Sequence, residues 1–466
     1  TEAQVTNNVD GVIALATGLQ SRFATSYGNF AYTAGLVTDE FAATSAALIS
    51  ISDAEQGAVP LGTGIADNVF NSVYRTVRTA DDLLTGADAL AAQIDPGTRS
   101  GLRALAFTLK AESLGEALQS YQRIPVQTLG VTAPTYVGRS QALPLVRALL
   151  DSAAATVAAT APSAFFNNSI LTPGVNLSNM IQLFRARYAR MAGDQATALT
   201  AANLVARSGT TAISVLTFPA PTVNPYAAVT GGTQGIAVRR QWRQSMLPQD
   251  QRFSYFVIPS TTLTGRIGAL LDPFSRWASP QAPLPVYQPD EALLIKAEAL
   301  ASQNNLAGAQ AALDSVRTDC TGGRGLDDPK ACLPALASQL TQADLLTEIY
   351  LQRRYELFGT GLRWEDARRR SAIRGPTAAP AVPLQLAIAM RIRTRASRRF
   401  LIRPSRRRFP PAARCSEDAN HDHESDQHSE SARGALHETQ HESCPDVGYA
   451  RVSRVVQRGL RYKGVG

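Results

Sequence analysis

The first 370 residues repeat apolar side chains at three- and four-residue spacing, in long stretches rich in alanine, leucine and arginine. This period places apolar side chains on one face of an α-helix, and these residue types have high helix propensity. Connections rich in glycine, proline and threonine separate the stretches. The pattern predicts an all-α fold, with helices at about 7–24, 68–92, 97–121, 140–160, 178–192, 195–208, 290–303, 306–318 and 341–358.

An internal repeat relates two of these helical segments at an offset of 111 residues. The stretch that begins at Ala186 aligns without gaps with the stretch that begins at Ala297, and each contains a helix, a polar turn and a second helix. Small residues at facing positions let the paired helices approach closely, as in a tetratricopeptide-type hairpin. An ordinary alanine-rich helical hairpin is the alternative. Both interpretations predict stacked helical pairs.

Residues 209–289 interrupt the helical pattern. They contain ten prolines and most of the aromatic residues of the middle of the chain. A compact domain rarely carries a featureless loop of this length. We therefore expect this loop-rich stretch to be a functional surface or an excursion with short strands.

The composition changes abruptly after residue 370. Residues 371–466 hold 17 of the 46 basic and 9 of the 38 acidic residues, which leaves 29 of each in residues 1–370. All five histidines also lie in this last part: His421, His423, His428, His437 and His441. We predict a body of residues 1–370 and an atypical Arg/His-rich tail of residues 371–466 without core periodicity.

Three hypotheses account for the tail. It could be a basic anchor for lipopolysaccharide or nucleic acid, or its histidines could hold a metal loosely. The hypothesis that we prefer is a reading-frame shift near residues 370–400 that replaced the native end and left a disordered tail. On that view the tail supplies no metal site.

The body lacks the residues on which several kinds of chemistry depend. It contains no histidine, so Ser-His and Cys-His nucleophile pairs are excluded, and it has no HExxH, GxSxG, GxxxxGK[ST] or GxGxxG motif. Its balanced charge argues against a nucleic-acid-binding face. No uninterrupted apolar run approaches the 18 or so residues of a membrane-spanning helix. We expect a protein that is neither an enzyme nor an integral membrane protein and that needs no cofactor or metal.

The most informative segment is residues 344–370. Arg353 and Glu356 fall on one face of the predicted helix, and a buried charge of this kind must find a partner in the fold. A second short helix is expected to begin at Arg363, with Trp364 packed on the preceding helix and Asp366 facing Arg353 or its neighbour Arg354.

This segment resembles the C-terminal signature of SusD/RagB-like proteins, the surface-exposed nutrient-binding lipoproteins of Bacteroidetes-type outer membranes. The residues that fit the signature are Arg353, Arg354, Glu356, Leu357, Gly361, Arg363, Trp364, Asp366, Arg368 and Arg369. Gln352 and Ala367 depart from it. Residues 74–84, 102–126 and 291–299 resemble further family motifs in the family's order, so the resemblance spans about residues 7–370. We interpret the signature residues as packing and salt-bridge positions.

The resemblance implies stacked tetratricopeptide-like hairpins with a long loop-rich excursion. It also implies non-catalytic binding of oligosaccharides or other nutrient oligomers for delivery to a SusC-like TonB-dependent transporter. The protein would be an outward-facing outer-membrane lipoprotein, anchored through a lipid-bearing cysteine upstream of Thr1. Two alternatives stay open: a tetratricopeptide-type protein-interaction scaffold, and a glycoside hydrolase that uses a pair of carboxylates.

Proteins bind sugars with aromatic faces and with side chains that hydrogen-bond to the hydroxyl groups. The loop-rich stretch offers such residues, and as ligand contacts we predict Trp242 and Tyr255 first, followed by Tyr226, Trp277 and Arg252. The aromatic and acidic residues of positions 27–40 form a second candidate region. Core packing under a long loop is the alternative for each aromatic residue.

Cys320 and Cys332 bracket a loop rich in glycine and aspartate. At an oxidising cell surface they could close a short disulfide loop. Two free buried thiols are the alternative, because the sequence does not fix the distance between them.

Overall fold

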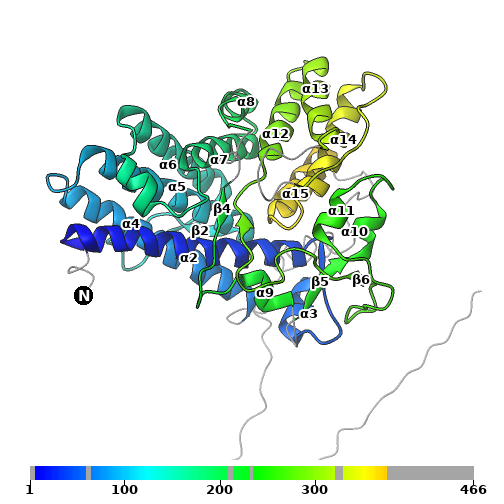
Figure 1. Ribbon diagram of the computed structural model, residues 1–466, viewed down its shortest axis with the longest axis horizontal. Coiled ribbons are helices and arrows are strands. Elements are labelled where there is room, and N and C mark those ends of the chain that lie inside the picture. The colour runs from blue at the N-terminus through cyan, green and yellow to red at the C-terminus, as the bar shows by residue number, and fades with distance from the viewer. Residues whose placement is uncertain (1–5, 59–63, 208–213, 231–234, 321–328, 375–466) are drawn as a thin grey trace, which may run out of the picture. The chain divides into compact units, whose positions relative to one another are not determined.

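The computed structural model describes residues 6–58, 64–207, 214–230, 235–320 and 329–374 (Figure 1). These residues are mostly helical, which confirms the predicted all-α fold class. The helices are α2 (Val9–Leu36), α3 (Ile49–Glu55), α4 (Ile65–Ala89), α5 (Pro96–Ser120), α6 (Arg139–Ala159), the π-helix η1 (Phe166–Ile170), α7 (Leu177–Ala192), α8 (Gln195–Asn203), α9 (Pro225–Thr230), α10 (Arg240–Gln244), α11 (Arg252–Phe256), α12 (Pro289–Ser302), α13 (Leu306–Arg317), α14 (Gln342–Glu356) and α15 (Leu362–Arg374).

The long helices pack against one another in a stack that follows the chain. Helix α4 packs on α2 and α5, α5 on α6, α6 on α7, and α7 on α8. The stack continues from α8 to α12, and α12 then contacts α13 and α14. The nine predicted helices are all present; the main differences are that α2 continues to Leu36 and that α8 ends at Asn203.

The internal repeat corresponds to the pairs α7–α8 and α12–α13. Gly193 and Asn304, which are related by the repeat, both adopt left-handed backbone conformations, with φ of 79° and 61°. The residue that follows each of them caps the next helix: the Asp194 side chain accepts from the amide of Thr197, and Asn305 does the same for α13. The two turns therefore use the same backbone geometry and the same cap.

The loop-rich stretch forms short strands. Strand β1 (Phe41–Ala43), which follows α2, pairs with β5 (Ile236–Arg239), and β5 pairs with β6 (Leu271–Asp272) in an antiparallel sheet. Strands β4 (Val215–Leu216) and β7 (Leu284–Pro285) form a second pair. The excursion is thus folded against the end of α2.

A β-hairpin connects α5 to α6. Its strands are β2 (Arg123–Pro125) and β3 (Tyr136–Gly138), with Pro125 opposite Tyr136. Helix α4 lies beside it, because the Tyr74 hydroxyl donates to the Pro125 carbonyl at 2.9 Å.

Helix α6 is the one helix of the described segments that is long and apolar enough to cross a membrane by length and composition, with a mean hydropathy of 1.4. Helix α6 meets this criterion because its many alanines keep the mean hydropathy of an 18-residue stretch high, although charged residues interrupt it. The expectation from the sequence considered only uninterrupted apolar runs. The buried side chains of α6, among them Val146 and Leu150, pack in the core. A single such helix is weak evidence for a membrane protein, because core helices meet the same criterion.

The chain divides into two units, residues 1–402 and 403–466, and the second lies outside the described residues. The predicted boundary after residue 370 stays a prediction. The three hypotheses for the tail likewise stay predictions, because the structure describes only residues 371–374 of it, as the last turn of α15.

Candidate ligand-binding surface

Four of the five residues that the sequence suggests as ligand contacts are buried. Trp242, Tyr226 and Arg252 have no exposed surface, and Trp277 is 3% exposed. Trp242 stacks on Phe358 with ring centroids 4.0 Å apart, so the aromatic residues of the excursion form a core rather than a surface. A side chain buried in this way cannot reach a ligand in solvent.

The Arg252 guanidinium of this cluster is also satisfied internally. The Arg252 guanidinium donates to Asp250 at 2.6 Å, to Glu356 at 3.2 Å and to Gln352 at 2.6 Å. Tyr255 is the one member that is partly exposed, and Arg276 lies over its ring at 4.3 Å. The aromatic residues of positions 27–32 are buried too. Of the predicted set, Tyr255 alone is accessible.

The signature residues form buried ion pairs. Asp366 accepts from Arg353 at 2.7 Å and from Arg190 of α7 at 2.8 Å. Burial by itself would raise the pKa of Asp366, but the two guanidinium groups lower it below its usual range. Asp366 therefore joins α15 to α7 and α14 as a carboxylate.

A second buried carboxylate, that of Asp39, pairs with two further signature arginines. Asp39 accepts from Arg363 at 2.6 Å and pairs with Arg354 at 2.9 Å, which ties α15 and α14 to the end of α2. Glu40, its neighbour, has a pKa raised to about 8 by burial and by the charge of Asp39. Trp364 is partly buried, and Arg368 lies over its ring at 5.6 Å.

A third ion-pair group crosses the stack. Arg187 of α7 donates to Glu112 of α5 at 2.6 Å and to Glu291 of α12 at 2.7 Å. Burial raises the pKa of Glu112 and of Glu116. These carboxylates with raised pKa values lie in the core, where no substrate can reach them, so they do not form the open pair of a glycoside hydrolase.

The structure joins Cys320 to Cys332 in a disulfide, with Cα atoms 4.5 Å apart. Between the two cysteines, residues 321–328 lie outside the described part of the chain. The Cys332 amide also donates to the Asp319 carbonyl at 2.9 Å. The pairing is structural, at the edge of the α12–α14 region.

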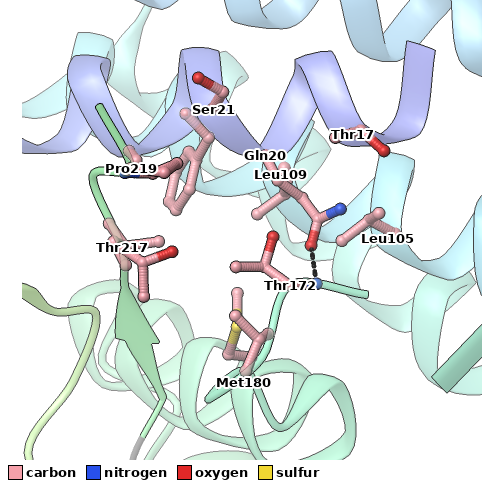
Figure 2. Close-up of a pocket in the computed structure, with 13 residues that line it drawn as sticks. Thr17, Gln20, Ser21, Leu105, Leu109, Thr172, Met180, Thr217 and Pro219 are labelled. Carbon is pink, nitrogen blue, oxygen red and sulfur yellow. Dashed lines mark hydrogen bonds between the residues drawn. The ribbon is translucent and has the colours of Figure 1, made fainter. Parts of the chain in front are cut away.

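Two crevices are poor candidates for an oligomer. The first, of about 110 Å³, lies between α2, α5 and β4 (Figure 2), and its central polar side chain, Gln20, accepts from the Thr172 amide at 2.8 Å. The second, of about 330 Å³, lies between α7, α12, α14 and α15. Its charged residues include Arg190, Glu298 and Asp366, which pair with one another.

An open groove of about 550 Å³ lies along the exposed side of α4. We call it the α4 groove, and its lining residues are Arg22, Asn71, Tyr74, Arg75, Arg78, Thr79 and Asp82. The helix positions them: Asn71, Arg75, Arg78 and Asp82 recur at the spacing that keeps side chains on one face. The opposite face of α4, which includes Val73 and Val77, is buried against the neighbouring helices.

An aromatic cluster adjoins this groove. Phe70, Tyr74 and Tyr121 form it through ring contacts, and Tyr136 joins it from the hairpin, where it lies opposite Pro125 and close enough to Tyr74 to affect its pKa. The Phe70 ring lies 4.4 Å from that of Tyr74 and 5.5 Å from that of Tyr121. Tyr136 of the β2–β3 hairpin is 45% exposed. Since Tyr74 belongs to both groups, partly exposed rings and hydrogen-bonding side chains meet on one surface.

Hydrogen bonds fix the hairpin to this surface. Besides the bond from Tyr74 to the Pro125 carbonyl, the Thr128 hydroxyl donates to Asp81 of α4 at 3.1 Å. Asp81 is also paired with Lys110 of α5. Burial raises the pKa of Tyr74, so its hydroxyl remains protonated and able to donate. The arrangement can bind a polar ligand with apolar faces, and it offers no acid–base pair.

Comparison with known proteins agrees with this fold and with the signature. Residues 281–410 match the SusD family. The solved structures that resemble the chain include a SusD superfamily protein from Bacteroides fragilis, with 15% identity, 77% of this chain and 89% of that chain covered, and a TM-score of 0.61. The chain thus carries a segment that matches the SusD family, on a fold that it shares with solved SusD superfamily structures. A comparison with curated protein sequences finds no match.

Two other structures similar to this SusD-like chain have names that mention a ligand. The surface glycan-binding protein A from Bacteroides uniformis shares 17% identity, with 78% of this chain and 90% of that chain covered and a TM-score of 0.59. A SusD-like carbohydrate binding protein from Bacteroides vulgatus shares 16% identity, with 78% and 84% covered and a TM-score of 0.59. At these identities the likeness establishes the fold.

The α4 groove was not predicted from the sequence, because residues 74–84 resemble a family motif that is interpreted as scaffold. The available signal was the polar spacing from Asn71 to Asp82, which marks an exposed face. Arg22 and Tyr136 could not have been added from the sequence, since they lie on other elements and reach α4 only through packing.

Proposed function

We propose that this SusD-like protein binds oligosaccharides in the α4 groove and releases them chemically unchanged. The observation that carries the proposal is the aromatic cluster beside an open groove lined by arginine, asparagine and aspartate side chains. Aromatic faces suit the apolar faces of sugar rings, and these polar groups suit their hydroxyls.

Similar folds support a carbohydrate ligand. Besides the two named above, a putative sugar binding protein from Bacteroides vulgatus resembles the chain, with 15% identity and a TM-score of 0.59. Names of this kind describe those proteins, and they make a glycan the first ligand class to test here.

The place of action and the partner follow from the resemblance to SusD/RagB-like proteins. We infer that the protein faces outward at the outer membrane, held by a lipid anchor upstream of Thr1. There it would deliver its ligand to a SusC-like TonB-dependent transporter. Co-purification of a large β-barrel transporter with the protein from its native membrane is the expected result.

Tyr136→Ala tests the placement of the site. The Tyr136 ring is largely exposed, whereas the Tyr74 hydroxyl holds the hairpin, so Tyr136 is the better residue to truncate. On a glycan panel we expect Tyr136→Ala to weaken the best oligosaccharide about tenfold, as measured by calorimetry.

The matched control is Phe165→Ala. Phe165 is 51% exposed and lies outside the α4 groove and the aromatic cluster. It should leave the affinity unchanged. Equal affinities for the wild type and Tyr136→Ala would refute the placement, and release of reducing sugar from the bound oligosaccharide would refute the non-catalytic role.

A further inference from the structure

The α4 groove carries an excess of positive charge. Three guanidinium groups line it, from Arg22, Arg75 and Arg78, against the single carboxylate of Asp82. Arg78 pairs with Asp82 at 3.0 Å. Among the described residues, neither Arg22 nor Arg75 has an ion-pair partner, and both are exposed. Two free cations therefore face the open groove.

This excess is a local property. Residues 1–370 contain equal numbers of basic and acidic side chains, so a typical surface of the body carries no net charge. Asp81, next to Asp82 on α4, is buried and paired with Lys110, so it does not neutralise the exposed arginines.

The dimensions of the groove suit an extended ligand. Asn71 and Asp82 are eleven residues apart on α4, which corresponds to about 16 Å along the helix axis. That distance exceeds the width of one sugar ring. Arg22 of α2 lies across from this row, so a chain in the groove would pass between arginines of two helices.

We propose that the α4 groove selects acidic oligosaccharides, whose uronate carboxylates or sulfate esters pair with Arg22 and Arg75. This inference rests on the proposed function and names its ligand class. A planar guanidinium donates two parallel hydrogen bonds to a carboxylate or sulfate, which gives both affinity and orientation. The sugar rings between the charged groups then lie against Tyr136 and Tyr74, and neutral chains leave the two arginines unpaired.

The test compares acidic probes with their neutral counterparts on the full-length protein. The probes are oligogalacturonate and a chondroitin sulfate oligosaccharide, and the counterparts are the carboxyl-reduced and the desulfated, carboxyl-reduced chains. We expect at least one acidic probe to bind about tenfold or more tighter than its counterpart. That advantage should shrink between about 0.05 M and 0.5 M NaCl, because salt screens exposed charges. Tighter binding of oligogalacturonate identifies the carboxylate as a recognised group, and a desulfated chondroitin chain that keeps its carboxylates shows whether the sulfate esters contribute.

Charge-removing variants locate the effect. Arg22→Gln and Arg75→Gln should each weaken the acidic probe about fivefold to tenfold and leave the neutral chain unaffected. Arg207→Gln is the matched control, since Arg207 is exposed and lies outside the groove. An equal loss in Arg207→Gln would mean attraction to the protein's overall charge and would overturn the assignment.

The outcomes separate this inference from the proposed function. If neutral oligosaccharides bind as tightly as acidic ones and Tyr136→Ala weakens both, the selection for acidic chains is overturned and glycan binding stands. If no acidic or neutral oligosaccharide binds, both are overturned.

Discussion

Arginine side chains of this protein lie either in the core or at the surface, and the helix face on which each arginine lies determines its environment. Arg187 of α7 is 2% exposed and donates to Glu112 and Glu291, whereas Arg185, two residues earlier, reaches the surface and pairs with Asp151. A buried ion has lost its hydration and depends on its partners. The surface pair remains hydrated and screened.

Arg187→Ala should destabilise the fold by about 3–5 kcal/mol, because it leaves two carboxylates buried without their cation. Urea unfolding followed by circular dichroism measures the loss. Arg185→Ala is the control on the same helix and should cost less than about 1 kcal/mol. Similar losses in the two variants would contradict the assigned role of burial.

At the scale of elements, the β2–β3 hairpin owes its place to a few hydrogen bonds with helices. The Tyr74 hydroxyl donates to the Pro125 carbonyl, and the Thr128 hydroxyl of the connecting loop donates to Asp81 of α4. Just before the hairpin, the Tyr121 hydroxyl donates to the Ala66 carbonyl of α4. Tyr136, on the opposite strand, points its ring to solvent. The hairpin thus presents one ring of the aromatic cluster while two others hold the surrounding backbone.

Tyr74→Phe removes one of these bonds and keeps the ring. We expect a loss of about 0.5–1.5 kcal/mol in stability. Hydrogen–deuterium exchange of residues 123–138 should accelerate, because the hairpin loses an attachment to α4. Tyr136→Phe is the control, and it should leave exchange of the hairpin at the wild-type rate. Equal exchange in the two variants would exclude the anchoring role.

The elements differ in how far the sequence predicts them. Helices such as α4 and α12 follow from local periodicity, which the sequence contains in full. The environment of Trp242 does not, because its ring packs on Phe358, 116 residues later in the chain. Composition alone shows an aromatic loop, and only the packing shows that the aromatic side chains face inward.

At the scale of the described unit, α15 is the element on which distant helices converge. Its acidic and basic side chains form ion pairs with α6 through Arg139–Glu365, with α7 through Arg190–Asp366, with α12 through Glu298–Arg369, and with α14 through Arg353–Asp366. Arg363 adds a pair with Asp39 after α2. This convergence gives Arg363, Asp366 and Arg369 a physical reason, because each closes a contact with a segment that is far away in sequence.

A pair of truncations tests this role. A chain that ends after Arg374 keeps all of these pairs, and we expect it to unfold at the same temperature as the full-length protein. A chain that ends after Gly361 lacks α15 and removes one ion-pair partner each from the buried Asp39, Arg190 and Arg353, which should prevent cooperative folding. Thermal unfolding followed by circular dichroism distinguishes the two. If the chain that ends after Gly361 melted as cooperatively as the longer one, the ion pairs of α15 would be dispensable and the signature would need another explanation.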